Sequence, residues 1–501
     1  MASRRDELNA YNFSRKRTVA SFLKPLPNGS VESAPKPLKH AISGIVMSVV
    51  ILAGFGACGM LSPVAPEGWD TPEAGIIVTD PSATRYVVLN SGEKDKKTGK
   101  DIPVLHPVLN LASAKLLLDP KKTKEGSVKT VKEKFLDESN IAQGSMVGIP
   151  YAPDRLPSVK DAGTAKVWAL CQKAIRGSQD RASVQQTVLV LNAKDAKKVT
   201  EKGSGKLAGN QALYVQDKAG KPYLVSSNGF SYELRASNSG DLPSLVRTLF
   251  GDGAEPRTVT DEWLSTLRKS PQAISMPTVP NDGQPSQATG VPAKYRTTGT
   301  LLRTRRGQHY LVEQDRLVPV TEFQTTLLRE TLSDSRSETV SQTDIQPDTA
   351  GKLAGGESWP VQAVSLANGG RADTSCSVYG GGSGTTDLTT WAGASLPVKS
   401  VAASASSYVS PGSGLLYQEQ EGTSDTGFNY LVTDTGLRYY LQVNNDSGKS
   451  TSGDDKSEVN QAKVRLGYES AQKVTVPSQW SKLLPSGPSL TTKAAKQTQN
   501  S

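Results

Sequence analysis

The hydrophobic residues of this chain are distributed very unevenly. Residues 41–61 read AISGIVMSVVILAGFGACGML, an uncharged apolar run in an otherwise hydrophilic sequence. At about 1.5 Å of rise per residue, a helix of this length just crosses a hydrocarbon core of ~30 Å. The pattern therefore predicts a single N-terminal transmembrane helix over residues 41–61.

The charges on either side of this run indicate its orientation. The 40 residues before it carry eight Lys or Arg and three Asp or Glu, whereas four acids precede the first base, Arg85, on the other side. Cytoplasmic flanks of membrane helices are enriched in Lys and Arg. We therefore predict a single-pass protein of the cell inner (plasma) membrane, with a cytoplasmic N-terminus and an extracytoplasmic C-terminal domain.

Two other interpretations of the run remain open. A cleaved secretory signal has a shorter apolar core of ~7 to 15 residues and a compact basic lead, whereas 40 residues precede this run. Lipoprotein processing would act at Cys58, which follows the small residues Gly56 and Ala57, although Phe55 fits such a site poorly. The long lead and the long run favour an uncleaved anchor.

The lead itself predicts a helix. Ser3 and Asp6 form a capping-box arrangement, and the helix is expected to end near Pro25. Its apolar stripe consists of Leu8, Tyr11, Val19 and Phe22. This basic amphipathic arm can dock on a neighbouring subunit or lie on anionic lipid, and the residues alone leave both interpretations open.

Beyond the membrane run, one pattern of apolar and polar positions recurs four times. Each copy has an aromatic residue followed by aliphatic ones, a polar or glycine-containing tip and a second apolar strand. The copies begin at Arg85, Pro222, His309 and Asn429. A leucine-rich helix follows three of them, and VPSQWSKLL from Val476 is taken as the helix of the fourth. Such hairpin-and-helix units must pack on one another, because none can bury its apolar face alone.

The fold class is therefore predicted as α+β, with four β-hairpin/helix repeats around a central core. The expected divisions are a cytoplasmic amphipathic arm at 1–40, the transmembrane helix at 41–61, repeat 1 at 62–118, core half 1 at 119–211, repeat 2 at 212–269, a flexible linker at 270–296, repeat 3 at 297–330, core half 2 at 331–427, repeat 4 at 428–490 and a disordered tail at 491–501.

The cysteines add one constraint. Apart from Cys58 in the apolar run, the chain has only Cys171 and Cys376. In an oxidising compartment two such residues are expected to pair, and closing so long a loop restricts the unfolded chain strongly. We predict a Cys171–Cys376 disulfide that brings the two core halves together.

The net charge of +10 is poor evidence for a nucleic-acid partner. An exported domain does not meet nucleic acid, so its partners are anionic wall polymers, lipid headgroups or acidic protein faces. Much of the excess lies in lysines between residues 94 and 134. Runs of this kind are usually solvated loops, and we predict no nucleic-acid partner.

No segment predicts an active site. The stretches GSGK at 203–206 and GGGSGTT at 380–386 lack the spacing of a phosphate-binding loop. Only two histidines, His106 in repeat 1 and His309 in repeat 3, follow the membrane run, so a zinc site or a histidine-dependent triad would have at most these two to use. Each stands in strand-like sequence, which favours a structural role. We therefore predict no catalytic, cofactor-binding or metal-binding residues and no cofactor.

Several stretches resemble one known family in their amino-acid sequence and in their order along the chain. They are RRDELNAYNF, LHPVLNLASAKLLL, GIPYAPDRLP, YLVTDTGLRY and VPSQWSKLLPSGPSL. Together with the basic arm, the apolar run and the pair Cys171 and Cys376, they resemble EccB, the membrane subunit of actinobacterial type VII (ESX) secretion systems. The resemblance extends from residue 3 to about residue 490.

This resemblance implies an elongated extracytoplasmic domain with quasi-twofold symmetry, in which repeat 1 pairs with repeat 4 and repeat 2 with repeat 3 about the disulfide-linked core. It also implies partners, namely EccC, EccD, EccE and the mycosin protease, and a homo-oligomer within a hexameric assembly. Members of the family have been described as ATPases. No nucleotide-binding motif supports that activity here, and EccC is expected to supply the hydrolysis.

The sequence is compatible with three functions from different classes. A structural membrane subunit that links the inner-membrane channel to the extracytoplasmic part explains the anchor, the arm and the repeats. An extracytoplasmic ATPase or hydrolase of the same secretion system is the alternative. A wall-binding module would explain only the basic loops. The first is our prediction.

Overall fold

The computed structural model of the chain divides into two compact units, Met1–Gly68 and Trp69–Ser501. It describes residues 3–23, 37–61, 65–96, 99, 101–123, 128–176, 182–237, 240–333, 336–348, 350–353, 356–369, 372–382, 387–398, 406–422, 424, 427–441 and 461–499.

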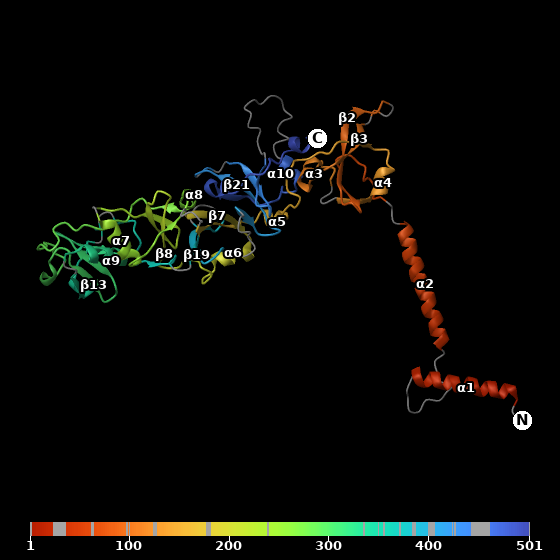
Figure 1. Cartoon of the computed structure of the whole chain (residues 1–501), viewed down its shortest axis with the longest axis horizontal. Coiled ribbons are helices and arrows are strands. Elements are labelled where there is room, and N and C mark those ends of the chain that lie inside the picture. The colour runs from red at the N-terminus through yellow and green to blue at the C-terminus, as the bar shows by residue number, and fades with distance from the viewer. Residues whose placement is uncertain are drawn as a thin grey trace. The chain divides into compact units, whose positions relative to one another are not determined.

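The first unit consists of two helices, α1 (Arg4–Leu23) and α2 (Pro37–Leu61), shown in Figure 1. At the start of α1 the amide of Ser3 donates to the Asp6 carboxylate at 3.2 Å, as the capping-box pattern predicts. The helix α2 contains the whole predicted run and begins four residues before it; Cys58 is among its residues whose side chains lie outside the described part. Within the described residues, no helix has both the length and the apolar character needed to span a bilayer.

Four sheets of the second unit share one topology. Three strands run antiparallel in chain order, a helix follows, and a fourth strand returns parallel to the first, so each sheet has the order 4-1-2-3. The first sheet is β1 (Ile76–Asp80), β2 (Arg85–Lys94), β3 (Asp101–Pro107), α3 (Leu111–Leu117) and β4 (Val128–Lys132). The second is β8 (Gln211–Gln216), β9 (Pro222–Ser226), β10 (Phe230–Glu233), α7 (Asp241–Phe250) and β11 (Arg257–Thr258).

The other two copies follow the same order. The third is β13 (Leu301–Thr304), β14 (His309–Val312), β15 (Leu317–Val320), α9 (Glu322–Thr331) and β16 (Ser337–Val340). The fourth is β21 (Leu415–Gln420), β22 (Asn429–Val432), β23 (Arg438–Leu441), α10 (Gln461–Arg465) and β24 (Val474–Pro477).

Each copy closes on the same two residues. A Thr-Val pair stands at the fourth strand, and its valine is almost fully buried in every case. The pairs are Thr130-Val131, Thr258-Val259, Thr339-Val340 and Thr475-Val476. A short helical turn then follows, as α4 (Glu133–Asp137), α8 (Asp261–Ser265), η3 (Gln342–Asp344) and α11 (Ser478–Ser481).

The repeats are therefore larger than the predicted hairpin-and-helix units. The first strand of repeat 4 begins at Leu415, before the expected bound at 428, and the fourth strands of repeats 1 and 3 lie beyond 118 and 330. VPSQWSKLL is not the crossover helix of repeat 4 but its last strand and the turn after it. The fourth strands are only two to five residues long, too short to show a period of two.

A fifth sheet forms the centre and contains β19 (Leu388–Gly393), β18 (Thr374–Tyr379), β6 (Val167–Arg176), β7 (Ala182–Leu191) and β20 (Ser407–Val409), in that order. The strands β18 and β6 pair antiparallel with Cys376 opposite Cys171. The two residues form the predicted disulfide, with both side chains fully buried. The two core halves therefore meet through one continuous sheet.

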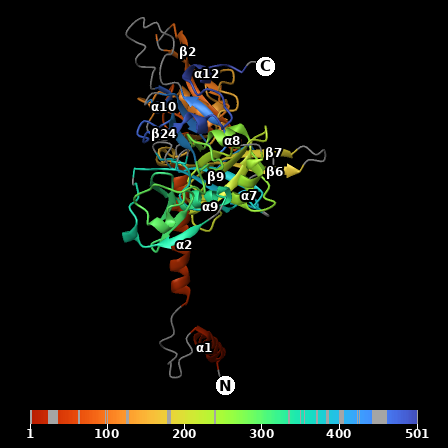
Figure 2. The same ribbon diagram turned by 90° about the vertical axis from the view of Figure 1, so that its left-hand side faces the viewer.

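The repeats pack in two halves on this central sheet. Repeats 2 and 4 share a core with it, around Trp168, Trp263 and Trp480. The other face of repeat 4 packs on repeat 1, and the other face of repeat 2 packs on repeat 3. The order is thus repeat 1, repeat 4, centre, repeat 2, repeat 3, which is the pairing that the resemblance implies; Figure 2 views these layers from the side of repeat 3.

Two segments differ from the sequence prediction because a few widely spaced apolar residues anchor them. The linker at 270–296 is ordered, with Ile274, Ala288 and Val291 buried. The tail was expected to be disordered, yet α12 (Thr492–Ala495) packs on α3 and the amide of Gln499 donates to the Met146 carbonyl at 2.9 Å. The shorter elements are β5 (Ala142–Gln143), α5 (Val159–Ala162), α6 (Ala193–Thr200), β12 (Arg268–Lys269), η2 (Ala293–Tyr295) and β17 (Ser365–Leu366).

Candidate functional site

The predicted docking residues lie on α1 and are exposed. Their exposed fractions are 61% for Leu8, 66% for Tyr11, 42% for Val19 and 89% for Phe22. At ~100° per residue these four fall within an arc of about 80° on the helix. Arg15 falls within the same arc, and the exposed Phe13 lies on the opposite side. The stripe is therefore interrupted by a cation, and α1 is less amphipathic than the sequence pattern predicts.

The two histidines that follow the apolar run make contacts within the fold. His106 Nδ1 lies 2.8 Å from the Ser145 carbonyl oxygen. Burial, together with Arg303 and Arg329, lowers the pKa of His309.

In the glycine-rich stretch GSGK, a Cβ on Gly205 would lie 2.6 Å from the Ala392 carbonyl, so close packing on β19 requires this glycine. Most of GGGSGTT, residues 383–386, lies outside the described residues, and in the described part no cluster of His, Cys, Asp or Glu could hold a metal ion.

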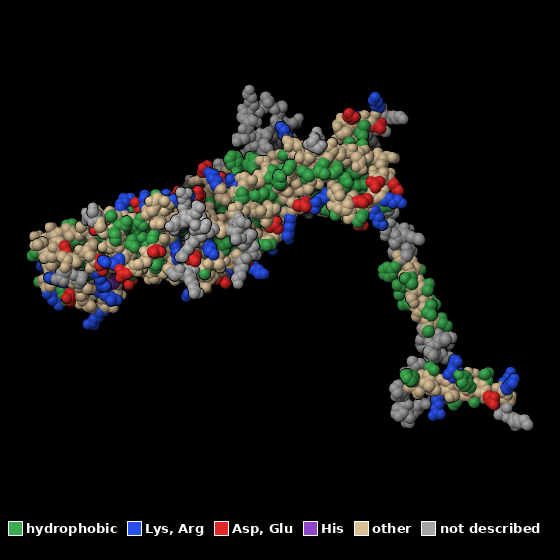
Figure 3. All heavy atoms as spheres, viewed as in Figure 1, with side chains coloured by type: hydrophobic (Ala, Val, Ile, Leu, Met, Phe, Trp, Pro, Cys, Tyr) green, Lys and Arg blue, Asp and Glu red, His purple; other side chains and the backbone are tan. Residues whose placement is uncertain are grey.

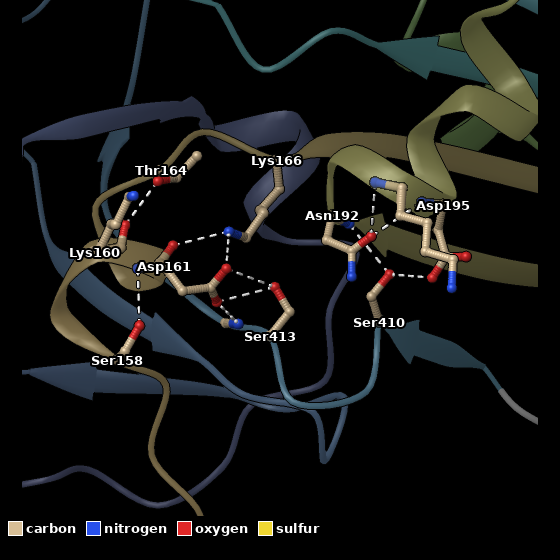
Figure 4. A network of polar contacts seen from close by, with 11 residues as sticks. Ser158, Lys160, Asp161, Thr164, Lys166, Asn192, Asp195, Ser410 and Ser413 are labelled. Carbon is tan, nitrogen blue, oxygen red and sulfur yellow. Dashed lines mark hydrogen bonds and ion pairs between the residues drawn. The ribbon is translucent and has the colours of Figure 1, made fainter.

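A half-buried carboxylate joins repeat 4 to the segment that leads into β6 (Figure 4). Asp161, on α5, accepts hydrogen bonds from Lys166 Nζ at 2.8 Å, from Ser413 Oγ at 3.0 Å and from the Gly414 amide at 2.8 Å. The Lys166 side chain is only 3% exposed. Burial alone would raise the pKa of Asp161, but the Lys166 ammonium and the Gly414 amide outweigh it and hold the pKa below its usual value.

A second carboxylate supports the same loop (Figure 4). Asp195 accepts from Lys198 Nζ and from Ser410 Oγ, both at 2.8 Å. The hydrogen bond from Lys198 lowers the pKa of Asp195 more than burial raises it. Both carboxylates are ionised and occupied by donors from their own chain. They are suited to hold the loop before β21 in place, and not to act as acids or bases.

The other half of the molecule has a neutral counterpart of this contact. Asn368 lies just before β18, as Asp161 lies before β6, and it is 1% exposed. Its Oδ1 accepts from the Tyr214 amide at 2.9 Å, and its Nδ2 donates to the Tyr214 carbonyl at 2.8 Å. Tyr214 is in the first strand of repeat 2, and Gly414 directly precedes the first strand of repeat 4. Neither contact could be predicted from the sequence, because Asp161 and Gly414 are 253 residues apart and Asn368 and Tyr214 are 154 residues apart.

A third polar cluster is enclosed within repeat 4. Glu419 Oε2 accepts from Arg438 Nη1 at 3.0 Å and from Ser481 Oγ at 2.6 Å, and Ser481 also contacts the Tyr417 hydroxyl at 2.7 Å. Burial raises the pKa of Tyr417 well above its usual value. Ser481 has no base beside it other than a carboxylate already paired with arginine. The arrangement therefore stabilises the sheet and does not activate a nucleophile.

A cavity of about 520 Å³ lies between repeats 1 and 4. Its lining includes Lys115 of α3, Val128 at the start of β4 and Val464 of α10. Lys115 Nζ donates to the Leu466 carbonyl at 3.3 Å, and burial lowers the pKa of this lysine. The cavity has the size of a small-molecule site but not the set of amides, lysine and metal-binding carboxylates that phosphoryl transfer requires.

Comparison with known families gives one result for the whole chain. The family model described as "Type VII secretion system ESX-1, transport TM domain B" matches residues 1–501. The protein named "ESX-3 secretion system ATPase EccB3" from Mycobacterium tuberculosis (strain ATCC 25618 / H37Rv) is 25% identical over 436 residues, covering 80% of this chain and 74% of that protein. "ESX-1 secretion system ATPase EccB1" from the same strain is 32% identical over 148 residues, covering 30% and 26%.

Solved structures share the fold. One chain of an intact ESX-5 inner membrane complex matches with a TM-score of 0.59 and 19% identity, covering 100% of this chain and 96% of that one. A chain of the EccB3 dimer from the ESX-3 core complex matches with a TM-score of 0.57 and 20% identity, covering 84% and 100%.

Proposed function

This chain belongs to the EccB family of type VII secretion proteins, and from that membership we propose that it is a structural membrane subunit of an ESX secretion complex. It links the inner-membrane channel to the extracytoplasmic part of the machine. The observation that carries the proposal is the family match over residues 1–501, which includes the arm, α2 and all four repeats.

The contacts in Trp69–Ser501 support a scaffolding role. The charged side chains of Asp161, Asp195 and Glu419 bind donors of their own chain that lie up to 253 residues away. Four copies of one unit then pack around a cross-linked sheet. Such a body is suited to hold partners at fixed positions, and these three carboxylates are already occupied by donors of the same chain.

We further propose that α2 anchors the chain in the inner membrane as a single pass. Its uncharged run and the basic residues before it support this orientation, with the arm in the cytoplasm and the repeats outside. The disulfide Cys171–Cys376 is consistent with an oxidising, extracytoplasmic compartment.

The proposed partners are EccC, EccD, EccE and the mycosin protease, with several copies of this chain in a hexameric assembly. The related EccB3 protein is described as a dimer in the ESX-3 core complex. To test membership, the tagged full-length chain is purified from detergent-solubilised envelopes and the co-eluting proteins are identified by mass spectrometry. Co-elution of EccC and EccD is expected, and a chain that elutes without them would contradict the proposal.

We propose that α1 supplies the cytoplasmic contact with these partners. Replacing Leu8, Tyr11, Val19 and Phe22 together by Ala should leave a membrane-inserted chain that no longer co-purifies with EccC or EccD. Phe13→Ala is the control, because it removes an exposed aromatic from the opposite side of the same helix. An unchanged yield of complex with the fourfold variant would limit the arm to binding lipid.

The alternative function is an extracytoplasmic ATPase or hydrolase of the same system. The printed names of the relatives favour it, since both EccB3 and EccB1 are called ATPases. Against it stand two observations: the described lining of the cavity lacks the combined set of amides, lysine and metal-binding carboxylates that phosphoryl transfer requires, and Asp161 and Asp195 are paired with donors of their own chain. The two functions differ in whether the purified chain releases phosphate from ATP.

A further inference from the structure

The cavity between repeats 1 and 4 combines two properties, an apolar wall of suitable size and a half-buried lysine. Its walls are largely apolar, formed by residues such as Ile76, Leu118 and Val464. Its volume of about 520 Å³ is within the range of about 300–1,000 Å³ typical of small-molecule sites. One edge reaches solvent at Val128, a large apolar side chain that is 52% exposed.

The second property is a half-buried lysine at this apolar wall. Lys115 forms no ion pair among the described residues, and the one hydrogen bond found for its ammonium is that to the Leu466 carbonyl at 3.3 Å. An ammonium has three donors. Burying a cation without a carboxylate is costly, and the lowered pKa of Lys115 has this cause.

Other charges at the cavity do not satisfy this lysine. Arg465 donates to the carbonyls of Leu116 and Leu118 at the end of α3, so its guanidinium closes that helix. Glu469 also belongs to the lining, but no ion pair joins it to Lys115. Among the described lining residues, two bases, Lys115 and Arg465, therefore face one acid, Glu469.

We propose that this cavity binds an amphiphilic monocarboxylate, a single hydrocarbon chain with one carboxyl group, whose carboxylate pairs with Lys115 and whose chain lies on the apolar wall. A peptide fits less well. Its backbone amides would need partners, and in the part of the lining that the structure describes Thr123 and Ser470 are the only uncharged polar side chains. The proposal is independent of the secretion role.

The same position in repeat 3 shows that the fold does not need a lysine here. Counting from the N-cap residues Asn110 and Thr321, Lys115 of α3 corresponds to Thr326 of α9. The hydroxyl of Thr326 donates to the Glu322 carbonyl at 3.1 Å within its own helix. The repeat can therefore fold with a side chain at this position that forms its hydrogen bond within its own helix. In repeat 1 the ammonium of Lys115 is available to pair with an external anion.

The test uses the full-length chain in phosphatidylcholine nanodiscs and dodecanoic acid labelled with ¹³C at the carboxyl carbon. The expected result is saturable binding of one dodecanoate per chain beyond that of empty nanodiscs, with the pKa of the bound carboxyl lower than in the nanodiscs alone. Lys115→Met keeps an apolar side chain of similar length and should weaken binding about tenfold or more. Lys121→Met, at an exposed site, is the matched control and should change nothing.

Two ligand controls complete the test. Dodecanol and dodecyltrimethylammonium should bind much more weakly, because neither has a carboxylate. Equal binding by Lys115→Met and the unchanged chain, or no saturable binding above empty nanodiscs, would overturn the proposal. A short apolar peptide with a free C-terminal carboxylate that binds more tightly than dodecanoate would overturn it in favour of a peptide site.

Discussion

The half built from repeats 1 and 4 and the half built from repeats 2 and 3 have the same topology but fasten themselves to the centre differently. In the first half the contact is ionic, between Asp161, Lys166 and the Gly414 amide. In the second it is neutral, between Asn368 and the backbone of Tyr214. The buried positions that define the unit are shared, whereas the residues that join units vary.

A second pair of equivalent positions gives the same lesson. Trp263 and Trp480 each follow the Thr-Val pair of their repeat and are fully buried against the central sheet. Trp263 Nε1 donates to the Leu170 carbonyl at 3.0 Å, whereas no partner is found for Trp480 Nε1 in the described part of the chain. Shape is therefore preserved between the halves even where polar contacts are not.

The largest effect is expected from the centre, which both halves share. Replacing Cys171 and Cys376 together by Ser should lower the free energy of unfolding by about 2 to 5 kcal/mol, because the unfolded variant is no longer constrained by the closed loop between these residues. Denaturant titration of the full chain measures the loss. Hydrogen exchange should rise in repeats 2 and 4 alike, and a change confined to one half would contradict the shared centre.

Removing the ionic contact should act on one half first. Asp161→Asn leaves the Lys166 ammonium buried without its carboxylate and should cost about 2 to 3 kcal/mol. Hydrogen exchange is expected to rise in β21 and its neighbours before β8. The control is Asp252→Asn, at an exposed turn after α7, which should be neutral. Equal protection of β21 in both variants would refute the role of Asp161.

The stability contributed by the ionic contact of Asp161 and by the neutral contact of Asn368 should also depend differently on pH. Asp161 has a lowered folded-state pKa, so its contribution is complete above about pH 4 and is lost as pH falls through that folded value. Asn368 does not titrate. The stability difference between the unchanged chain and Asp161→Asn should therefore shrink below about pH 4, whereas the loss caused by Asn368→Ala should stay constant. Denaturant titrations across this pH range measure both.

The tryptophan pair predicts a smaller difference. Trp263→Phe loses both ring volume and the hydrogen bond to Leu170, whereas Trp480→Phe loses ring volume alone. The first should be more destabilising by about 1 kcal/mol. Denaturant titration of the two variants is the measurement, and an equal or larger cost at Trp480 would show that its indole nitrogen has a partner.

Much of the molecule could be predicted from the sequence because the signals were local. The run at 41–61 lies in one helix, Cys171 and Cys376 are paired, and each hairpin follows from its aromatic and aliphatic residues. The fourth strands were missed because two to five residues carry no clear period. The linker and tail were missed because single apolar residues such as Ile274 and Ala495 anchor them.

The joining contacts could not be predicted for a different reason. Asp161, Lys166 and Asn368 are ordinary polar residues in their local sequence. Their partners, 253 and 154 residues away in the cases of Gly414 and Tyr214, are brought near only by the folded central sheet. Lys115 resembles any helix lysine until α10 closes the cavity beside it.

Phosphate release from Mg-ATP by the purified full-length chain tests the central claim most directly. If the chain is a structural subunit, the rate of phosphate release falls to background as contaminating ATPases are removed over successive columns. Lys206→Ala in the GSGK stretch then leaves that rate unchanged. Turnover that follows the chain through every column and disappears with a single substitution in it would contradict the account and establish the enzyme.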